Sequence, residues 1–243
     1  IRHRLSSRWS IQASAALQHR SENPEAYYPT PYYRNYRTLV HMKKELGKTQ
    51  SQSYMLYTEY KRPVKEFFWT LMLNHFNIRK DHLIHTEYQD YQFKLTSLEH
   101  PHRTENYQAR SLISKGFYSW NLKASLEAVY QYGKGLQAGQ GIVQPYENHW
   151  LSLKPKLNWN PTHWLTASYQ AEIGCSRTIS LPTLWEVQQK LSLSIGNDTW
   201  NLNLNGEHYR NELSPNEYKE TWLADIGLQY NTGKWRWTAG LTN

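Results

Sequence analysis

The most regular stretch of the chain is residues 164–176, where apolar and polar side chains alternate without interruption. The apolar positions in it are Leu165, Ala167, Tyr169, Ala171, Ile173 and Cys175. Because successive side chains of a β-strand point to opposite faces, this strand has one apolar face and one polar face. About thirteen residues at roughly 3.3 Å each span about 40 Å, which exceeds most strands of globular proteins. Tilted by about 45°, such a strand crosses an apolar layer about 25 Å thick, so the pattern predicts a membrane β-strand.

The same alternation recurs along the chain and predicts about ten strands, joined by turns that contain Gly, Asn or Pro. The predicted strands are residues 9–20, 52–61, 66–79, 105–117, 120–132, 148–159, 164–176, 185–195, 199–210 and 220–230, with a last strand from residue 234. Short turns alternate with long connections, so all the short turns are expected at one end of the sheet. Within the long connections, residues 88–98 are predicted to extend a strand beyond the membrane, and residues 133–141 to form a flexible outer loop.

Aromatic residues gather beside the short turns. They are Phe67, Phe68, Trp69, Phe117, Trp120, Trp159, Trp164, Trp200, Trp235 and Trp237. Such a belt is typical of the membrane–water interface of an outer-membrane barrel, whereas a soluble β-sandwich has no need of it. We therefore predict an all-β fold, a transmembrane antiparallel β-barrel, in which the whole of residues 1–243 is barrel wall with short periplasmic turns and longer extracellular loops.

A few positions depart from the pattern. Pro155 lies in the middle of a predicted strand, and a β-bulge is expected there because proline has no N–H for the ladder. Tyr209 and Leu223 fall on the face predicted to line the lumen, and Gln189 falls on the apolar face, where the sequence offers no explanation for it.

Composition agrees with a barrel rather than a helical membrane protein. The mean hydropathy is −0.83, and the longest apolar run, residues 67–73, is too short for a transmembrane helix. The single cysteine excludes an internal disulfide and a cysteine-rich metal site. The net charge of +8 is scattered among acidic residues rather than gathered into a stripe, so no nucleic-acid partner is expected.

Both ends of the sequence suggest a piece of a larger protein, because no initiating Met is present and the last strand stops abruptly. The closing residues 230–243 read Tyr-Asn-Thr-Gly-Lys-Trp-Arg-Trp-Thr-Ala-Gly-Leu-Thr-Asn. This segment resembles the strand that runs into an Asn-Leu-Phe type motif near the end of TonB-dependent outer-membrane receptors. The layout of the strands is similar to the C-terminal half of the barrel in that family.

The resemblance implies a 22-stranded barrel in the outer membrane of a Gram-negative cell, of which this chain supplies about ten strands. It implies partners as well: outer-membrane lipid, a plug domain of the same protein, an inner-membrane energy-coupling protein reached through the N-terminal part, and an unidentified nutrient ligand. No cofactor is implied. The residues that couple transport to energy would lie outside this segment.

No known catalytic or nucleotide-binding motif is present, and we do not expect an enzyme. His82, His85, His100 and His102 lie close together in sequence and are metal-ligand candidates, although exposed loop histidines are more often plain polar surface. Charged residues of both signs on the predicted luminal face have several open interpretations: they pair with one another, contact a plug, or form a solvated wall.

The best candidate for ligand contact is a tyrosine-rich loop. Its candidate residues are Tyr27, Tyr28, Tyr32, Tyr33, Arg34 and Tyr36. Aromatic faces beside arginine suit sugars, peptides or anionic chelates alike, but such tyrosines can also simply pack loops together. The sequence thus favours a nutrient receptor and transporter, and leaves open a complete small barrel that acts as an enzyme or adhesin.

Overall fold

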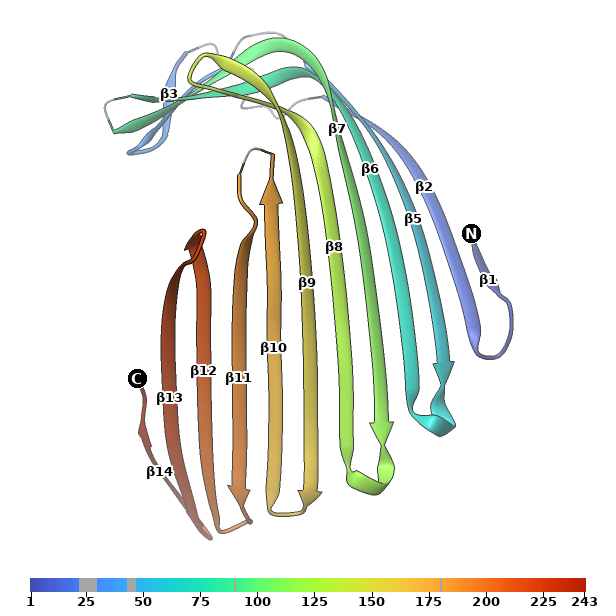
Figure 1. The fold of residues 1–243 in the computed structure, drawn as a ribbon, viewed down its shortest axis with the longest axis vertical. Coiled ribbons are helices and arrows are strands. Elements are labelled where there is room, and N and C mark those ends of the chain that lie inside the picture. The colour runs from blue at the N-terminus through green and yellow to red at the C-terminus, as the bar shows by residue number, and fades with distance from the viewer. Residues whose placement is uncertain (22–29, 43–46, 90, 180) are drawn as a thin grey trace.

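A computed structural model describes residues 1–21, 30–42, 47–89, 91–179 and 181–243. These residues form one large, almost entirely antiparallel sheet in a single layer, which curves but does not close (Figure 1). Its helical content in the described ranges is two 3-10 turns, Pro63–Lys65 and Tyr118–Trp120. None of the helices in these ranges is long or apolar enough to cross a membrane. The all-β class and the antiparallel barrel-wall architecture are thus confirmed.

Every strand predicted from the alternation is present. The strands are β1 (Arg2–Arg4), β2 (Trp9–Ser21), β3 (Tyr32–Asn35), β4 (Thr38–His41), β5 (Lys48–Arg62), β6 (Phe67–Gln89), β7 (Gln92–Phe117), β8 (Leu122–Gly139), β9 (Ile142–Thr162), β10 (Leu165–Thr178), β11 (Leu184–Gly196), β12 (Trp200–Ser214), β13 (Glu217–Thr232) and β14 (Trp235–Leu241). They pair in sequence order from β1 to β14, except that β3 and β4 leave the main path as a separate hairpin.

The strand register places the apolar side chains of all the long strands on one common face. Tyr169 of β10 lies directly opposite Leu157 of β9 and Leu191 of β11. Ile173 in the same way faces Leu153 and Val187. Directly opposed residues project to the same side of a sheet, so the alternation of each strand adds up to one continuous apolar face and one continuous polar face.

Several connections predicted as loops are strand hairpins instead. The segment 133–141 was predicted to be flexible, but β8 and β9 stay paired up to Gly139 and Ile142. The turn itself is Gln140-Gly141, with φ of 50° and 77°, as a tight two-residue hairpin turn requires. Residues 88–98 were predicted to continue one strand, but they are divided between two: Tyr88 and Gln89 end β6, Tyr91 lies in the turn, and residues 92–98 belong to β7.

The β-bulge expected at Pro155 is not present, and that prediction was wrong. Pro155 pairs with Leu126 of β8 in an unbroken register. Toward β10 the ladder omits its pairing with Ala171 but resumes without a shift at Leu153 and Ile173. The ladder therefore lacks two local pairings beside the proline, Pro155 with Ala171 and Lys154 with Glu172, and the pairs on either side hold the register.

Two of the three side chains on the unexpected face, Gln189 and Tyr209, have hydrogen-bond partners, and nothing in the structure explains Leu223. On the apolar face, the hydroxyl of Tyr169 donates to Oε1 of Gln189 at 3.0 Å, and Nε2 of Gln189 lies 3.4 Å from Nδ1 of His208. On the polar face, the hydroxyl of Tyr209 donates to Oε2 of Glu207 at 2.5 Å. Gln189 is thus hydrogen-bonded within the sheet, which explains how its amide is accommodated on that face.

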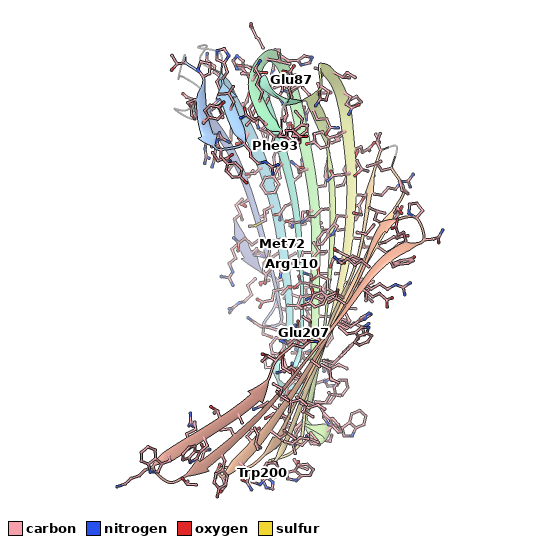
Figure 2. The ribbon with its side chains drawn as sticks, turned by 90° about the vertical axis from the view of Figure 1, so that its left-hand side faces the viewer. Met72, Glu87, Phe93, Arg110, Trp200 and Glu207 are labelled. Atoms are coloured by element: carbon pink, nitrogen blue, oxygen red, sulfur yellow. The ribbon has the colours of Figure 1, made fainter. Side chains whose placement is uncertain are left out.

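The two ends of the sheet differ. The connections β5–β6, β7–β8, β9–β10, β11–β12 and β13–β14 lie at one end, which we call the short-turn end, and at the other the extended parts of β6 to β9 bend over together with the β3–β4 hairpin (Figure 1). Tight turns also occur away from the short-turn end, at Gln140-Gly141 and Pro215-Asn216, so the expectation that all short turns lie at one end was wrong. Buried apolar side chains are few, and three of them belong to this bent end: Val40, Leu83 and Ala138. The straight wall is one layer thick, so its side chains stand on either side of the ribbon (Figure 2).

Candidate ligand-binding surface

The bent end is assembled by a parallel pairing that the sequence pattern does not reveal. Strand β4 lies alongside β7, with Thr38 opposite Phe93 and His41 opposite Thr96. The N–H of Phe93 donates to the carbonyl of Arg37 at 2.7 Å. Val40, at the centre of β4, has no exposed surface. Backbone bonds and one buried side chain therefore fix the β3–β4 hairpin on the extension of β7.

His85 holds the neighbouring strands together. Its Nε2 accepts the N–H of Gly141 at 2.9 Å, and its Nδ1 lies 3.4 Å from Oγ1 of Thr96. Since Nε2 accepts a hydrogen bond, the proton of the neutral ring is on Nδ1, which can donate to Thr96. His85 thus links β6, β7 and the β8–β9 turn, a structural use of both ring nitrogens.

The other histidines of this region do not join His85 in a metal site. Nδ1 of His102 lies 3.0 Å from the carbonyl oxygen of His100. In the described part of the chain, no group of three or more His, Cys, Asp or Glu side chains has an arrangement suited to a metal ion. The recorded partners of His85 and His102 are backbone groups, the hydroxyl of Thr96 and, at 3.9 Å from Nδ1 of His85, Oε1 of Glu87.

The hairpin docking brings two sets of exposed rings to the same place, which we call the aromatic tip. Its members are Tyr33, Tyr36, Tyr88, Tyr91 and Phe93, and Phe93 is labelled near the bent end in Figure 2. The hydroxyl of Tyr33 donates to Oε1 of Gln92 at 3.4 Å, which joins the two hairpins. The rings of Tyr88 and Phe93 are 5.1 Å apart.

Two rings of the aromatic tip are notably exposed. Tyr36 is 84% exposed and has the guanidinium of Arg37 5.9 Å from its ring centroid. Tyr91 is 79% exposed and has φ of 63°, a conformation that bulky residues rarely adopt. Exposed aromatic faces beside a guanidinium are suited to ring-containing or anionic ligands.

The structure places only part of the predicted site. Tyr27 and Tyr28 lie outside the described residues. Tyr32, Tyr33 and Arg34 belong to β3 and Tyr36 to the turn after it; Tyr32 is half-buried and the other three are exposed. Their role in ligand contact stays a prediction. Tyr88, Tyr91 and Phe93 were missed as partners, since only the β4–β7 pairing brings them there, although their aromatic clustering around a turn was a visible signal.

The docking of the hairpin gives a local prediction. Replacing Val40 by alanine should weaken the β3–β4 hairpin by about 2 kcal/mol, since two buried methyl groups are lost and a cavity is left. Amide hydrogen exchange of residues 38–41 should then accelerate more than tenfold, while exchange in β10 stays unchanged. Val64→Ala, at a valine that is 99% exposed in the short-turn end, is the control. Equal exchange in both variants would show that Val40 does not hold the hairpin.

The polar face carries charges of alternating sign on neighbouring strands. Nη2 of Arg110 lies 2.8 Å from Oε2 of Glu127, and Nζ of Lys154 lies 2.7 Å from Oε1 of Glu172. Lys190 pairs in the same way with Glu207. Of the three interpretations open for these charges, mutual pairing accounts for these six residues.

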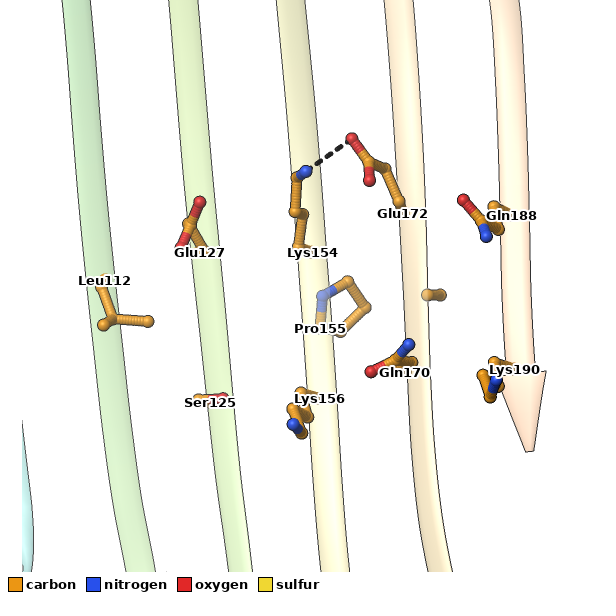
Figure 3. Close-up of a pocket in the computed structure, with 11 residues that line it drawn as sticks. Leu112, Ser125, Glu127, Lys154, Pro155, Lys156, Gln170, Glu172, Gln188 and Lys190 are labelled. Atoms are coloured by element: carbon orange, nitrogen blue, oxygen red, sulfur yellow. Dashed lines mark ion pairs between the residues drawn. The ribbon is translucent and has the colours of Figure 1, made fainter. Parts of the chain in front are cut away.

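Between these pairs the wall is hollowed into a shallow pocket, which Figure 3 shows from the polar face. Glu127, Lys154 and Glu172 stand on one side of it, and Lys156, Gln170 and Lys190 on the other. The ion pair of Lys154 with Glu172 crosses from β9 to β10. Lys156 takes part in no ion pair among the described residues, so the pocket has one uncompensated cation.

The apolar face is bounded by two rows of aromatic side chains. Near the short turns, Trp9 lies 5.6 Å from Trp69, and the rings of Phe117 and Trp120 are 5.8 Å apart. Phe68 is an exception in this row, because it lies opposite Ser114 on the polar face. Between the rows the face is aliphatic, with Leu73, Leu126, Leu153, Leu157, Leu191 and Ile226 partly exposed.

A second aromatic row, which we call the upper row, crosses the same face nearer the bent end. His75 is stacked 5.9 Å from Tyr54 and 4.3 Å from Tyr107. The row continues through Tyr132 to His149, whose rings are 4.8 Å apart. His208 stacked on Trp222 at 4.0 Å occupies a similar place in β12 and β13. The sequence pattern predicts only the row beside the short turns.

No protein-family model matches the sequence. A search of the curated proteins found no match either. Among solved structures, the chain is similar to the siderophore receptor PirA from Acinetobacter baumannii, with a TM-score of 0.49 and 9% sequence identity. The match covers 98% of this chain and 50% of that receptor, so the chain spans about half its length. A likeness of this size assigns neither a ligand nor an activity.

Proposed function

We propose that this chain is one wall of a β-barrel receptor in the outer membrane, which captures a nutrient at its loops and passes it through a gated pore. In this proposal the apolar face contacts lipid, the polar face lines the lumen, and the bent end lies outside the cell. The barrel takes up its ligand with energy supplied through other parts of the protein. The proposal includes no catalytic step.

The observation that carries the proposal is the apolar band between the two aromatic rows. About eight to ten residues separate an upper-row ring from the short-turn end of its strand, as between Tyr107 and Phe117 or His208 and Trp200. At roughly 3.3 Å per residue this is about 26–33 Å of strand, or about 20–25 Å of height at a tilt near 40°. That height matches the apolar band of outer-membrane barrels.

The open sheet edges support a barrel larger than this wall. Within the described ranges, strand β14 pairs only with β13, and β2 pairs with β5 on one side and only the short β1 on the other. Unpaired strand edges are unfavourable within a membrane, because lipid cannot replace the missing hydrogen bonds. Further strands of the same protein would satisfy them, and the polar face with its paired charges would then line the lumen.

The orientation can be tested by thiol labelling of intact cells. The variants are Tyr33→Cys at the aromatic tip and Tyr118→Cys in the 3-10 turn, each in a background where Cys175 is replaced by Ser. Both tyrosines are exposed, at 59% and 86%, so they differ in position rather than in accessibility within the fold. A membrane-impermeant reagent should label the Tyr33→Cys variant in intact cells and the Tyr118→Cys variant only after permeabilisation. Labelling of both in intact cells would contradict the proposal.

A further inference from the structure

The apolar face changes its chemistry in layers above the aliphatic band. Along β5, β6 and β7, the row Leu56, Leu73 and Ala109 is followed by the aromatic row Tyr54, His75 and Tyr107. The next row contains Gln52, Asn77 and Glu105, and the one after it Gln50, Arg79 and Arg103. Aliphatic, aromatic, amide and cationic groups thus succeed one another, which is the order of chemical environments from a bilayer interior to its headgroups.

The two arginines lie directly opposite each other on neighbouring strands. Arg79 of β6 pairs in register with Arg103 of β7, and both side chains are exposed. Like charges at directly opposed positions are unfavourable in a sheet. Arg79 has no ion pair among the described residues, so no carboxylate beside Arg79 offsets its repulsion of Arg103.

A chain of hydrogen bonds orients Arg103. Its Nε donates to Oδ1 of Asn77 at 2.6 Å, and Nδ2 of Asn77 donates to Oε1 of Gln52 at 3.0 Å. Nε also lies 3.1 Å from Oε1 of Glu105. Both Nη groups of Arg103 remain without a partner in the described residues. They are therefore available as a fork for a bidentate acceptor such as a phosphate.

The charge balance of this place is positive. Glu105 is shared between Arg103 and Lys134, whose Nζ lies 3.2 Å from Oε2 of Glu105. Glu147 lies directly opposite Lys134 on the other side, so two carboxylates stand against three cations when Arg79 is included, and a net positive charge remains. Gln50, Gln52, Asn77, Arg79 and Arg103 line a shallow pocket, so the groups surround a space into which an anion fits.

We propose that this pocket, the Arg79–Arg103 site, binds the phosphate group of a lipid in the surrounding membrane. This inference rests on the proposed membrane location. A lipid rather than a free phosphate is favoured because the aromatic and aliphatic rows lie directly below the pocket on the same face. When the two guanidinium groups hold the phosphate of a lipid, the acyl chains of that lipid lie against Tyr54, His75 and Leu73. The site is separate from both the aromatic tip and the polar face.

The test compares the full wild-type protein with the double variant Arg79→Gln/Arg103→Gln and with Lys123→Gln. Lys123 lies on the polar face, opposite Gly116 and Asn158, and has no ion pair in the described ranges, so Lys123→Gln removes one positive charge at a distant place without breaking an ion pair. Each protein is reconstituted into vesicles of phosphatidylcholine, with or without phosphatidic acid. The lipids that remain bound after extraction are counted by native mass spectrometry, and heat-resistant migration on gels checks folding.

Wild type and Lys123→Gln should retain phosphatidic acid at least tenfold more than phosphatidylcholine, and the double variant should lose this preference. A tenfold loss corresponds to about 1.4 kcal/mol. Equal retention in the folded double variant, or no preference in wild type, would overturn the site. Displacement of phosphatidic acid by millimolar inorganic phosphate would overturn its assignment to lipid. Failure of wild type to enter any vesicle would instead refute the membrane location, and the lipid site with it.

Discussion

Replacing Leu191 by arginine should lower the free energy of unfolding by about 2–4 kcal/mol, because the change places a charge near mid-bilayer on the lipid face. Leu191 is 46% exposed and lies in the aliphatic band, opposite Tyr169 and Gly206. Ala171 on the same face is only 7% exposed, so a large side chain there would add a packing cost. Leu191 is therefore the cleaner position for this measurement, by urea unfolding of the reconstituted protein.

The control for Leu191→Arg is Gln188→Arg in the same strand. Gln188 faces the polar side, where it lies opposite Glu172 and Tyr209. An arginine there stays in water beside a carboxylate, so the expected change is below about 1 kcal/mol. Equal destabilisation by the two substitutions would mean that the two faces do not differ in environment, which contradicts a membrane barrel.

The triple replacement of Tyr33, Tyr36 and Tyr91 by alanine should weaken ligand capture at least tenfold and leave the barrel as heat-resistant as wild type. Each aromatic contact contributes about 0.5–1.5 kcal/mol, so three lost rings exceed the roughly 1.4 kcal/mol that a tenfold change requires. All three rings are exposed at the tip, so their removal leaves no buried cavity. The quantity measured, by mass spectrometry, is the amount of small-molecule ligand that each purified protein retains from the medium of the cells that produced it.

Tyr118→Ala serves as the control for the tyrosine variants, since Tyr118 is 86% exposed at the opposite end of the sheet. It should leave retention unchanged. Loss of heat resistance in the triple variant would show that these tyrosines only pack the hairpins. Unchanged retention would move the ligand site away from the aromatic tip.

The fold was predictable because each strand carries its own information. Alternation is a local property, so the face of the sheet on which Tyr169 or Leu126 lies can be predicted from its own strand, without reference to the neighbouring strands. The register in which these strands pair then brings the faces together. The same logic should have extended β8 and β9 to Gly139 and Ile142, but four glycines in the segment suggested flexibility instead.

The sites depend on pairings between distant segments, which local patterns do not contain. No pattern in residues 38–41 indicates their parallel pairing with residues 93–96. Of the aromatic tip, therefore, only Tyr33 and Tyr36 were among the predicted site residues. The opposition of Arg79 and Arg103 likewise needs the register of β6 against β7. Pro155 shows the reverse case, in which a local rule predicted a bulge and the surrounding ladder kept the register.

The most direct test of the central claim is a spin-label scan of β10 in the reconstituted protein. Single cysteines are introduced at residues 166–173 in a Cys175→Ser background, and the collision of each label with oxygen and with a water-soluble nickel chelate is measured. We expect a period of two, with oxygen contact highest at the odd-numbered positions Ala167, Tyr169, Ala171 and Ile173, and chelate contact highest at the even-numbered ones. A scan without this period, or with its two faces exchanged, would contradict a wall that separates lipid from a polar lumen.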